Sequence, residues 1–111
     1  MEEGGDPAAI LKLRSAIREA DGVLIATPEY SHGMSGVLKN TLDWLSRSSV
    51  GAPLKDKPAA FMGTAPGRFG TVRAQEQLKL ALLAVKARVF VQSGLALAGA
   101  GTKFKQAELI D

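Results

Sequence analysis

The sequence contains no cysteine among its 111 residues. This excludes disulfide bonds, thiol nucleophiles and thiolate ligands for a metal ion within the chain. With a single histidine as well, the chain offers few groups that bind transition metals, and we expect no metal site. The lack of cysteine fits a reducing compartment, so we expect the protein in the cytoplasm.

Long apolar runs and long charge runs are also missing. No apolar stretch approaches the ~20 residues that a membrane-spanning helix needs, and the acidic, glycine-rich N-terminus is unlike a secretory signal. The net charge is +3, but lysines and arginines are scattered among acidic residues instead of forming a basic stripe. We therefore expect neither a membrane nor a nucleic acid as partner. With 46% apolar residues, residues 1–111 are expected to form one globular domain.

The most informative stretch begins with a short apolar run, residues 23–27. Its β-branched and aliphatic side chains predict a strand, which Pro28 ends because proline cannot continue a hydrogen-bonded ladder. Because the run contains no alternating polar residues, it predicts a strand buried on both faces, as in a parallel sheet between helices.

A polar loop over residues 28–36 follows this strand, and the apolar spacing then changes to that of a helix. Ser35 is placed to cap the helix, and one helical face is expected to be apolar. That face comprises Val37, Leu38, Thr41, Leu42 and Leu45. In open α/β sheets, ligands bind at the carboxyl ends of strands, where this loop is expected to lie.

The rest of the chain repeats this alternation of helix and strand. We expect a first helix over residues 7–20, with Asp6 as its N-cap, and a last helix over residues 71–86 that is well buried because Leu80 and Leu83 widen its apolar face. Strands are expected over residues 59–63 and 88–92, and residues 95–101 form a short strand or a turn. The pattern predicts an α/β protein with a parallel sheet of about three to four strands and right-handed crossovers.

The polar loop and its helix resemble the signature of the NADPH-dependent FMN reductase family, whose members include quinone, chromate and azo-compound reductases. The matching residues are Pro28, Glu29, Tyr30, Gly36, Leu38, Lys39, Asn40, Asp43 and Trp44. The chain departs from the family pattern at Ser31, where asparagine is usual.

The resemblance implies a three-layer, flavodoxin-like parallel sheet that is truncated at its N-terminus. The family's first loop reads roughly G-S-x-R-x-x-S and holds the FMN phosphate on backbone amides at a helix N-terminus. No such string occurs in the sequence. We therefore expect a single domain over residues 1–111 that is incomplete at its N-terminal side.

The resemblance also implies which residues bind the cofactor. In the family, the loop after the strand lies against the flavin ring. This assigns cofactor binding to Pro28, Glu29, Tyr30, Ser31, His32 and Gly33. A second, glycine-rich loop adds Gly63, Gly67, Arg68 and Gly70.

Simpler explanations exist for the same residues. Tyr30 could merely pack against the protein and Ser31 could merely form a turn, and the glycines could serve turn geometry alone. The helix after the second loop favours a negative charge at its N-terminus, as at the polar edge of a reduced flavin. We assign no catalytic residue, and His32 is not interpreted as a general base, because in flavin chemistry the cofactor reacts and the protein orients it.

The function implied by the resemblance is that of an oxidoreductase that uses FMN and NADPH, or NADH. Its mechanism would be ping-pong: the nicotinamide nucleotide reduces bound FMN, and a small-molecule electron acceptor then takes the electrons. A homodimer or homotetramer is expected. The alternative is a non-enzymatic, truncated flavodoxin-like module that self-associates through an open sheet edge and binds flavin weakly or not at all.

Overall fold

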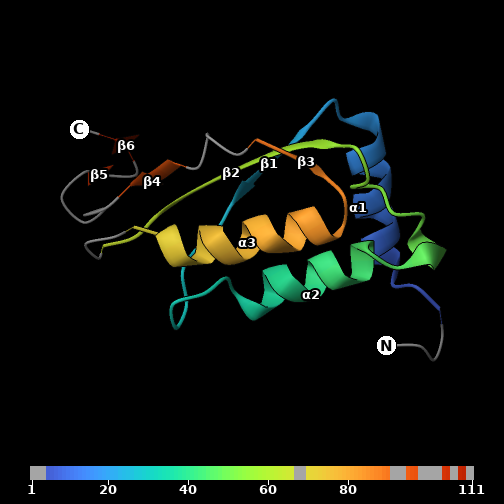
Figure 1. Ribbon diagram of the computed structural model, residues 1–111, viewed down its shortest axis with the longest axis horizontal. Helices are drawn as coiled ribbons and strands as arrows, with labels where there is room; N and C mark the ends of the chain where they lie inside the picture. The colour runs from blue at the N-terminus through green and yellow to red at the C-terminus, as the bar shows by residue number, and fades with distance from the viewer. Residues whose placement is uncertain (1–4, 67–69, 91–94, 98–103, 106–107, 110–111) are drawn as a thin grey trace.

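The computed structural model describes residues 5–66, 70–90, 95–97, 104–105 and 108–109 (Figure 1). The elements in chain order are α1 (Ala8–Glu19), β1 (Val23–Ala26), α2 (Gly36–Leu45), the 3-10 turn η1 (Ser48–Val50), β2 (Pro58–Thr64), α3 (Val72–Ala84), β3 (Arg88–Val89), β4 (Leu95–Leu97), β5 (Phe104–Lys105) and β6 (Glu108–Leu109). The predicted order of helices and strands is confirmed where the structure describes the chain, with ends that differ by one to a few residues. Residues 91–92 and 98–101 of the predicted strands lie outside the described residues.

The main sheet is parallel and has β2 at its centre. β1 pairs with one side of β2, with Val23 opposite Ala59 and Ala26 opposite Met62. β3 pairs with the start of β2 and β4 with its end. Met62 is paired with Ala26 of β1 on one side and with Leu95 of β4 on the other. β4 therefore lies on the same side of β2 as β3. The described part of the sheet thus has three strand positions, and β3 and β4 share one of them.

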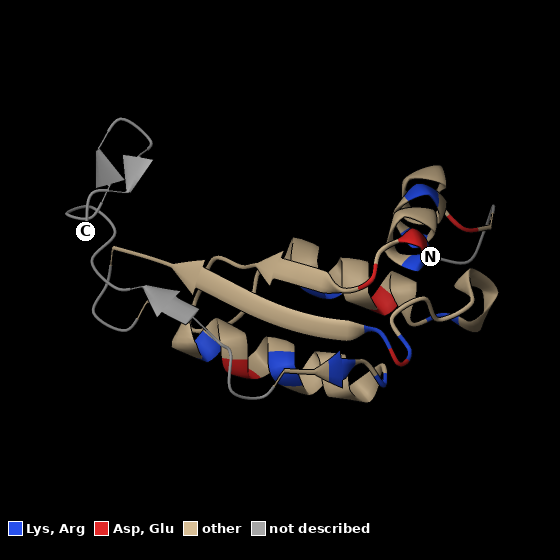
Figure 2. Ribbon diagram, turned by 90° about the horizontal axis from the view of Figure 1, so that it is seen from above, with Lys and Arg blue, Asp and Glu red and all other residues tan. Residues whose placement is uncertain are grey.

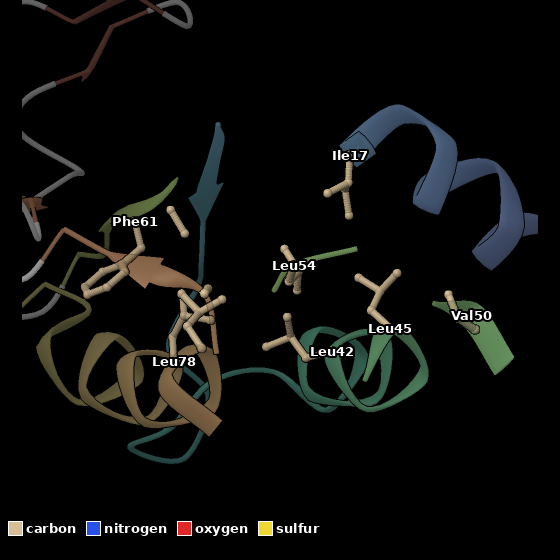
Figure 3. Packing of buried hydrophobic residues seen from close by; sticks show 10 residues of the cluster. Ile17, Leu42, Leu45, Val50, Leu54, Phe61 and Leu78 are labelled. Carbon is tan, nitrogen blue, oxygen red and sulfur yellow. The ribbon is translucent and has the colours of Figure 1, made fainter. Parts of the chain in front are cut away.

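Helices α2 and α3 cover one face of this sheet. In Figure 1, β2 runs above α2 and α3, and α1 stands at the end of the molecule where β2 begins. Apolar side chains from the helices, η1 and β2 fill the space between the layers (Figure 3). The buried cluster consists of Ile17, Leu42, Leu45, Val50, Leu54, Ala59, Phe61, Leu78, Leu82 and Ala87. Removing such side chains from water is the main stabilising contribution in a core of this kind.

The opposite face of the sheet, which we call the bare face, is exposed. Leu24 is 63% exposed, Met62 37% and Phe90 65%. Leu24, Ala60 and Phe90 line a shallow groove on this face. The prediction that the first strand is buried on both faces was wrong, because no helix that the structure describes lies over the bare face, which Figure 2 shows from above. Within the described residues, β1 pairs only with β2, so its outer edge is open, as expected.

The predicted N-cap of α1 was also wrong. Pro7, not Asp6, is the N-cap of α1, and no side chain of the described residues caps that helix. The Asp6 carboxylate instead accepts a hydrogen bond from Ser49 Oγ (3.1 Å) and lies 3.7 Å from Arg47 Nε. Sequence position alone did not reveal these partners, which are more than 40 residues away.

The outer face of α3 is exposed instead of well buried. Val72, Leu80 and Leu83 are 46%, 67% and 50% exposed. Leu78 and Leu82, on the opposite face of the same helix, are fully buried against the sheet. Val37 at the start of α2, predicted to lie on the apolar face, is 80% exposed. A helix that packs against one sheet buries one face only, so the additional apolar residues remain at the surface.

Among the described helices, none has the length and apolar character to span a membrane.

Candidate functional site

Two loops meet at the carboxyl ends of β1 and β2. We call residues 27–35 the first loop and residues 65–71 the second loop; the structure describes residues 65–66 and 70–71 of the latter. The Thr27 backbone N–H donates to the Met62 carbonyl (2.9 Å), which extends the pairing of the strands into the first loop. In Figure 1, both loops lie at the left-hand end of the molecule, beside the start of α3.

The first loop contains a tight turn whose tip is exposed. Tyr30 and Gly33 exchange two backbone hydrogen bonds of 2.9 Å each. The two residues between them have left-handed backbone angles, with φ 50° at Ser31 and 65° at His32. Positive φ at both central residues is the mark of a type I′ turn. Tyr30 beside this turn is 62% exposed, so among the described residues it does not pack into the protein as the simpler explanation required.

The side chain of Glu29 points away from this tip, toward the start of α3. Its Oε1 accepts hydrogen bonds from the backbone N–H groups of Arg73 (2.8 Å) and Ala74 (3.0 Å). Its Oε2 lies 3.5 Å from the Arg73 guanidinium, and the carboxylate side chain is only 11% exposed. The hydrogen bond from the Ala74 amide, with those from Arg73 and its positive charge, lowers the pKa of Glu29 below its ordinary value of 4.5.

Glu29 therefore caps a helix that follows it by more than 40 residues. The first amides of a helix lack partners within the helix, and their partial positive charge favours an anion. From the sequence, we expected this helix N-terminus to favour a negative charge such as that at the polar edge of a reduced flavin. The structure shows that the negative charge there belongs to the protein itself, and that the Glu29 side chain is engaged with α3. Contact between Glu29 and a cofactor would involve its backbone.

A second side chain joins α3 to the first loop in the reverse direction. Gln77 Oε1 accepts a hydrogen bond from the Met34 backbone N–H (3.0 Å). Gly33 leaves room for this side chain, because a Cβ at Gly33 would lie 2.5 Å from Gln77 Oε1. The sequence analysis missed Gln77, since nothing in a helical pattern indicates that one polar residue reaches a loop 43 positions away.

The glycines of the second loop have structural roles where they are described. A Cβ at Gly63 would overlap the Thr71 hydroxyl and lie 2.5 Å from the Thr27 carbonyl oxygen. Gly70 is buried and has a φ of 62°, which glycine adopts readily. Gly67 and Arg68 lie outside the described residues. The surroundings of Gly63 and the backbone angle of Gly70 therefore support the simpler explanation, in which these glycines are needed for the local backbone shape.

A separate hollow of about 240 Å³ lies near the C-terminal ends of α2 and α3, away from both loops. Aliphatic residues, a serine and two lysines line it, and it contains no aromatic or acidic side chain. Its lining residues are Leu45, Ser46, Ala52, Leu54, Lys55, Ala84, Val85 and Lys86. The exposed aromatic ring and the turn lie at the loops, so we place the candidate site there.

In the part of the chain that the structure describes, no three His, Asp or Glu side chains are grouped to hold a metal ion.

A parallel sheet with helices packed against it and two loops at its carboxyl edge defines the chain as an α/β protein that could bind a ligand at these loops. The model of the family described as "NADPH-dependent FMN reductase" matches residues 1–102. The chain belongs to this family.

Relatives agree with this assignment. An NAD(P)H-dependent FMN reductase of Pseudomonas aeruginosa is 51% identical over 79 residues, which are 71% of this chain and 42% of that protein. A quinone reductase of Escherichia coli is 42% identical over 88 residues, covering 79% of this chain and 46% of the relative. Among solved structures, the flavoenzyme FerB, an NAD(P)H:(acceptor) oxidoreductase from Paracoccus denitrificans, superposes with a TM-score of 0.83 at 32% identity, over 95% of this chain and 58% of FerB.

These matches confirm the flavodoxin-like fold and the predicted family. The chain spans less than half the length of the two curated relatives and 58% of the length of FerB.

Proposed function

We propose that the chain provides the ring-binding part of an NAD(P)H-dependent, FMN-using oxidoreductase that passes electrons to a small-molecule acceptor by a ping-pong mechanism. The observation that carries this proposal is the family match over residues 1–102. The names of its relatives include quinone and FMN reductases, so quinones and free flavins are the acceptors to test first. We place this activity in the cytoplasm.

The exposed turn of the first loop fits the ring of a flavin. Within the described residues, the backbone N–H groups of Ser31 and His32 have no partner, and both residues are exposed. Such donors suit the carbonyl and nitrogen acceptors at a flavin's polar edge, and the exposed Tyr30 ring offers an apolar surface beside them. When bound, FMN would supply the chemistry of hydride acceptance and electron transfer. The residues of the turn would bind and orient its ring.

The described residues fit the phosphate of FMN less well. Two helices begin at this edge of the sheet, and helix N-termini are the usual sites for a phosphate. At α2, the Ser35 hydroxyl accepts from the Leu38 N–H (3.2 Å), and at α3 Glu29 occupies the Arg73 and Ala74 amides. Each helix N-terminus thus already has an acceptor from the chain itself.

The test is an absorbance spectrum of the purified 111-residue chain with added FMN, before and after desalting, followed by addition of NADPH or NADH. We expect a retained flavin spectrum that the nicotinamide nucleotide bleaches. The variant Tyr30→Ala should bind FMN several-fold more weakly, because it removes an aromatic surface worth about 1 kcal/mol, and Tyr30→Phe is the matched control that keeps the ring. A chain that stays colourless at high FMN concentration would contradict the proposal and leave the non-enzymatic alternative.

We also propose that the chain forms a homodimer or homotetramer through the outer face of α3. The exposed apolar residues Val72, Leu80 and Leu83 support this, because large apolar side chains at the surface of one helix favour association. Leu80→Glu should shift the mass measured by light scattering toward the monomer. Ala9→Glu, which places the same charge on an exposed position of α1, should leave the mass unchanged. An unchanged mass for Leu80→Glu would contradict this interface.

A further inference from the structure

The first loop and α3 are joined by two side chains that reach in opposite directions. Glu29 leaves the loop and binds the Arg73 and Ala74 amides of the helix, and Gln77 leaves the helix and binds the Met34 amide of the loop. The two attachments lie on either side of the turn formed by residues 30–33. We call this pair of attachments the clamp.

We propose that Gln77 is a positioning residue for flavin binding: by holding the Met34 amide, it fixes the loop in the shape that presents the turn at residues 30–33. This inference rests on the proposed function, because it assigns Gln77 a role in the binding of the FMN ring. Gln77 acts through the loop and needs no contact with the cofactor.

The turn needs such support because its own interactions are few. Two non-glycine residues, Ser31 and His32, hold positive φ angles, which L-amino acids adopt at a cost. Among the residues that the structure describes, one pair of backbone hydrogen bonds, between Tyr30 and Gly33, closes the turn. A short hairpin of this size is marginally stable on its own in water. A strained turn persists only where its surroundings hold it, and the clamp fixes the chain on both sides of this one.

The residue before Met34 shows how closely the loop is fitted to Gln77. Gly33 is buried, and an added Cβ would lie 2.5 Å from Gln77 Oε1 and 2.8 Å from Gln77 Nε2. The loop backbone thus passes directly over the carboxamide, at a distance that only glycine permits. A preformed loop lowers the ordering cost of ligand binding, so the clamp should strengthen cofactor affinity without contributing a contact.

The experiment compares the wild-type chain with Gln77→Ala, Gln77→Glu and Glu76→Gln. Gln77→Ala removes the acceptor, whereas Gln77→Glu keeps an oxygen that can accept from Met34. Glu76→Gln changes the neighbouring exposed residue and is the matched control. Amide hydrogen exchange at Met34 and at the buried Leu78 is followed by NMR without flavin, and FMN affinity is measured by fluorescence quenching.

For Gln77→Ala, we expect the Met34 amide to exchange at least about threefold faster and FMN affinity to fall about threefold to tenfold, the equivalent of one hydrogen bond. Exchange at Leu78 should not change, which separates loss of loop position from general destabilisation. Gln77→Glu should restore both values at neutral pH, and Glu76→Gln should match the wild type.

Two results would overturn the inference. The first is unchanged Met34 exchange in Gln77→Ala, and the second is faster Met34 exchange with wild-type FMN affinity. If the wild-type chain itself binds no FMN, the proposed function fails and the positioning role for flavin fails with it. The exchange data would then decide separately whether Gln77 holds the loop.

Discussion

Ser31 occupies a backbone conformation that asparagine adopts more readily. Its φ is 50° in the first position of the type I′ turn, where asparagine, aspartate and glycine are preferred. The variant Ser31→Asn should therefore stabilise the chain by about 0.5 kcal/mol, seen as a higher urea midpoint with an unchanged slope.

The control for this prediction is Ser48→Asn, which makes the same change at an exposed position in the 3-10 turn η1. It should have no stabilising effect, because the backbone there is not left-handed. An equal rise in both variants would show that asparagine acts through the unfolded chain or the surface and not through the turn.

Gly63 is required for a different reason, which is space. A methyl group at this position would overlap the side chain of Thr71 and approach the Thr27 carbonyl oxygen. We expect Gly63→Ala to destabilise the chain by about 1–3 kcal/mol, the range typical of an overpacked interior. Chemical denaturation measures the change.

Gly36 provides the contrasting case. A Cβ at this residue, the first of α2, meets nothing within 4 Å. Gly36→Ala should be neutral or stabilise by up to about 0.5 kcal/mol, because alanine favours the helix. If Gly63→Ala proved as harmless as Gly36→Ala, the close packing of β2 against Thr71 would be wrong.

At the scale of elements, the stability of α3 is coupled to the first loop through the charge of Glu29. Hydrogen bonds from the start of α3 lower the pKa of this carboxyl in the folded state relative to the unfolded chain, where the ordinary value is 4.5. A lowered pKa means that the unfolded state takes up the proton first as the pH falls. The stabilisation is therefore fully present above about pH 4.5 and is lost as the pH falls through the lower, folded value.

The variant Glu29→Gln tests this coupling. At neutral pH it should be less stable than the wild type, because it lacks the negative charge at the helix N-terminus. The difference in urea midpoint between the two proteins should shrink as the pH falls below about 4.5. Glu76→Gln, on the exposed face of the same helix, serves as control. A difference for Glu29→Gln that stayed constant with pH would contradict a charged cap.

The sequence predicted the elements well because each depends on local patterns. Proline at residue 28, the apolar spacing of α2 and its capping Ser35 all act within a few residues, and the structure confirms the strand end, the helix and the cap. The roles of Glu29 and Gln77 depend on contacts across more than 40 residues. No local pattern contains this information. Glu29, which the motif assigned to cofactor binding, therefore proved to direct its side chain to the start of α3.

Burial was predicted less well for the same physical reason. An apolar strand or helix predicts that a neighbour covers it, but the sequence pattern does not say whether that neighbour belongs to the same chain. Leu24 on the bare face and Leu80 on the outer face of α3 have no cover in the part of the chain that the structure describes. The exposure of these two side chains is the largest difference between the structure and the burial expected from the sequence.

For the molecule as a whole, the fit to the cofactor is uneven. The exposed turn suits the flavin ring, but the Leu38 amide at the start of α2 and the Arg73 and Ala74 amides at the start of α3 already have acceptors from the chain. The 111 residues also contain no G-S-x-R-x-x-S string. Charge-assisted hydrogen bonds to a phosphate are worth about 1.5–3 kcal/mol each, so a phosphate cradle would favour FMN over riboflavin by orders of magnitude.

We therefore predict that this 111-residue chain binds riboflavin and FMN with affinities that agree within about threefold, a difference of less than 1 kcal/mol. Fluorescence titration with the two flavins measures the ratio, and raising the salt concentration should change it little, since no bound phosphate is being screened. Riboflavin and FMN share the ring, so the comparison isolates the phosphate without altering the protein. An FMN preference of a hundredfold or more would mean that this chain holds the phosphate with groups other than the two helix N-termini.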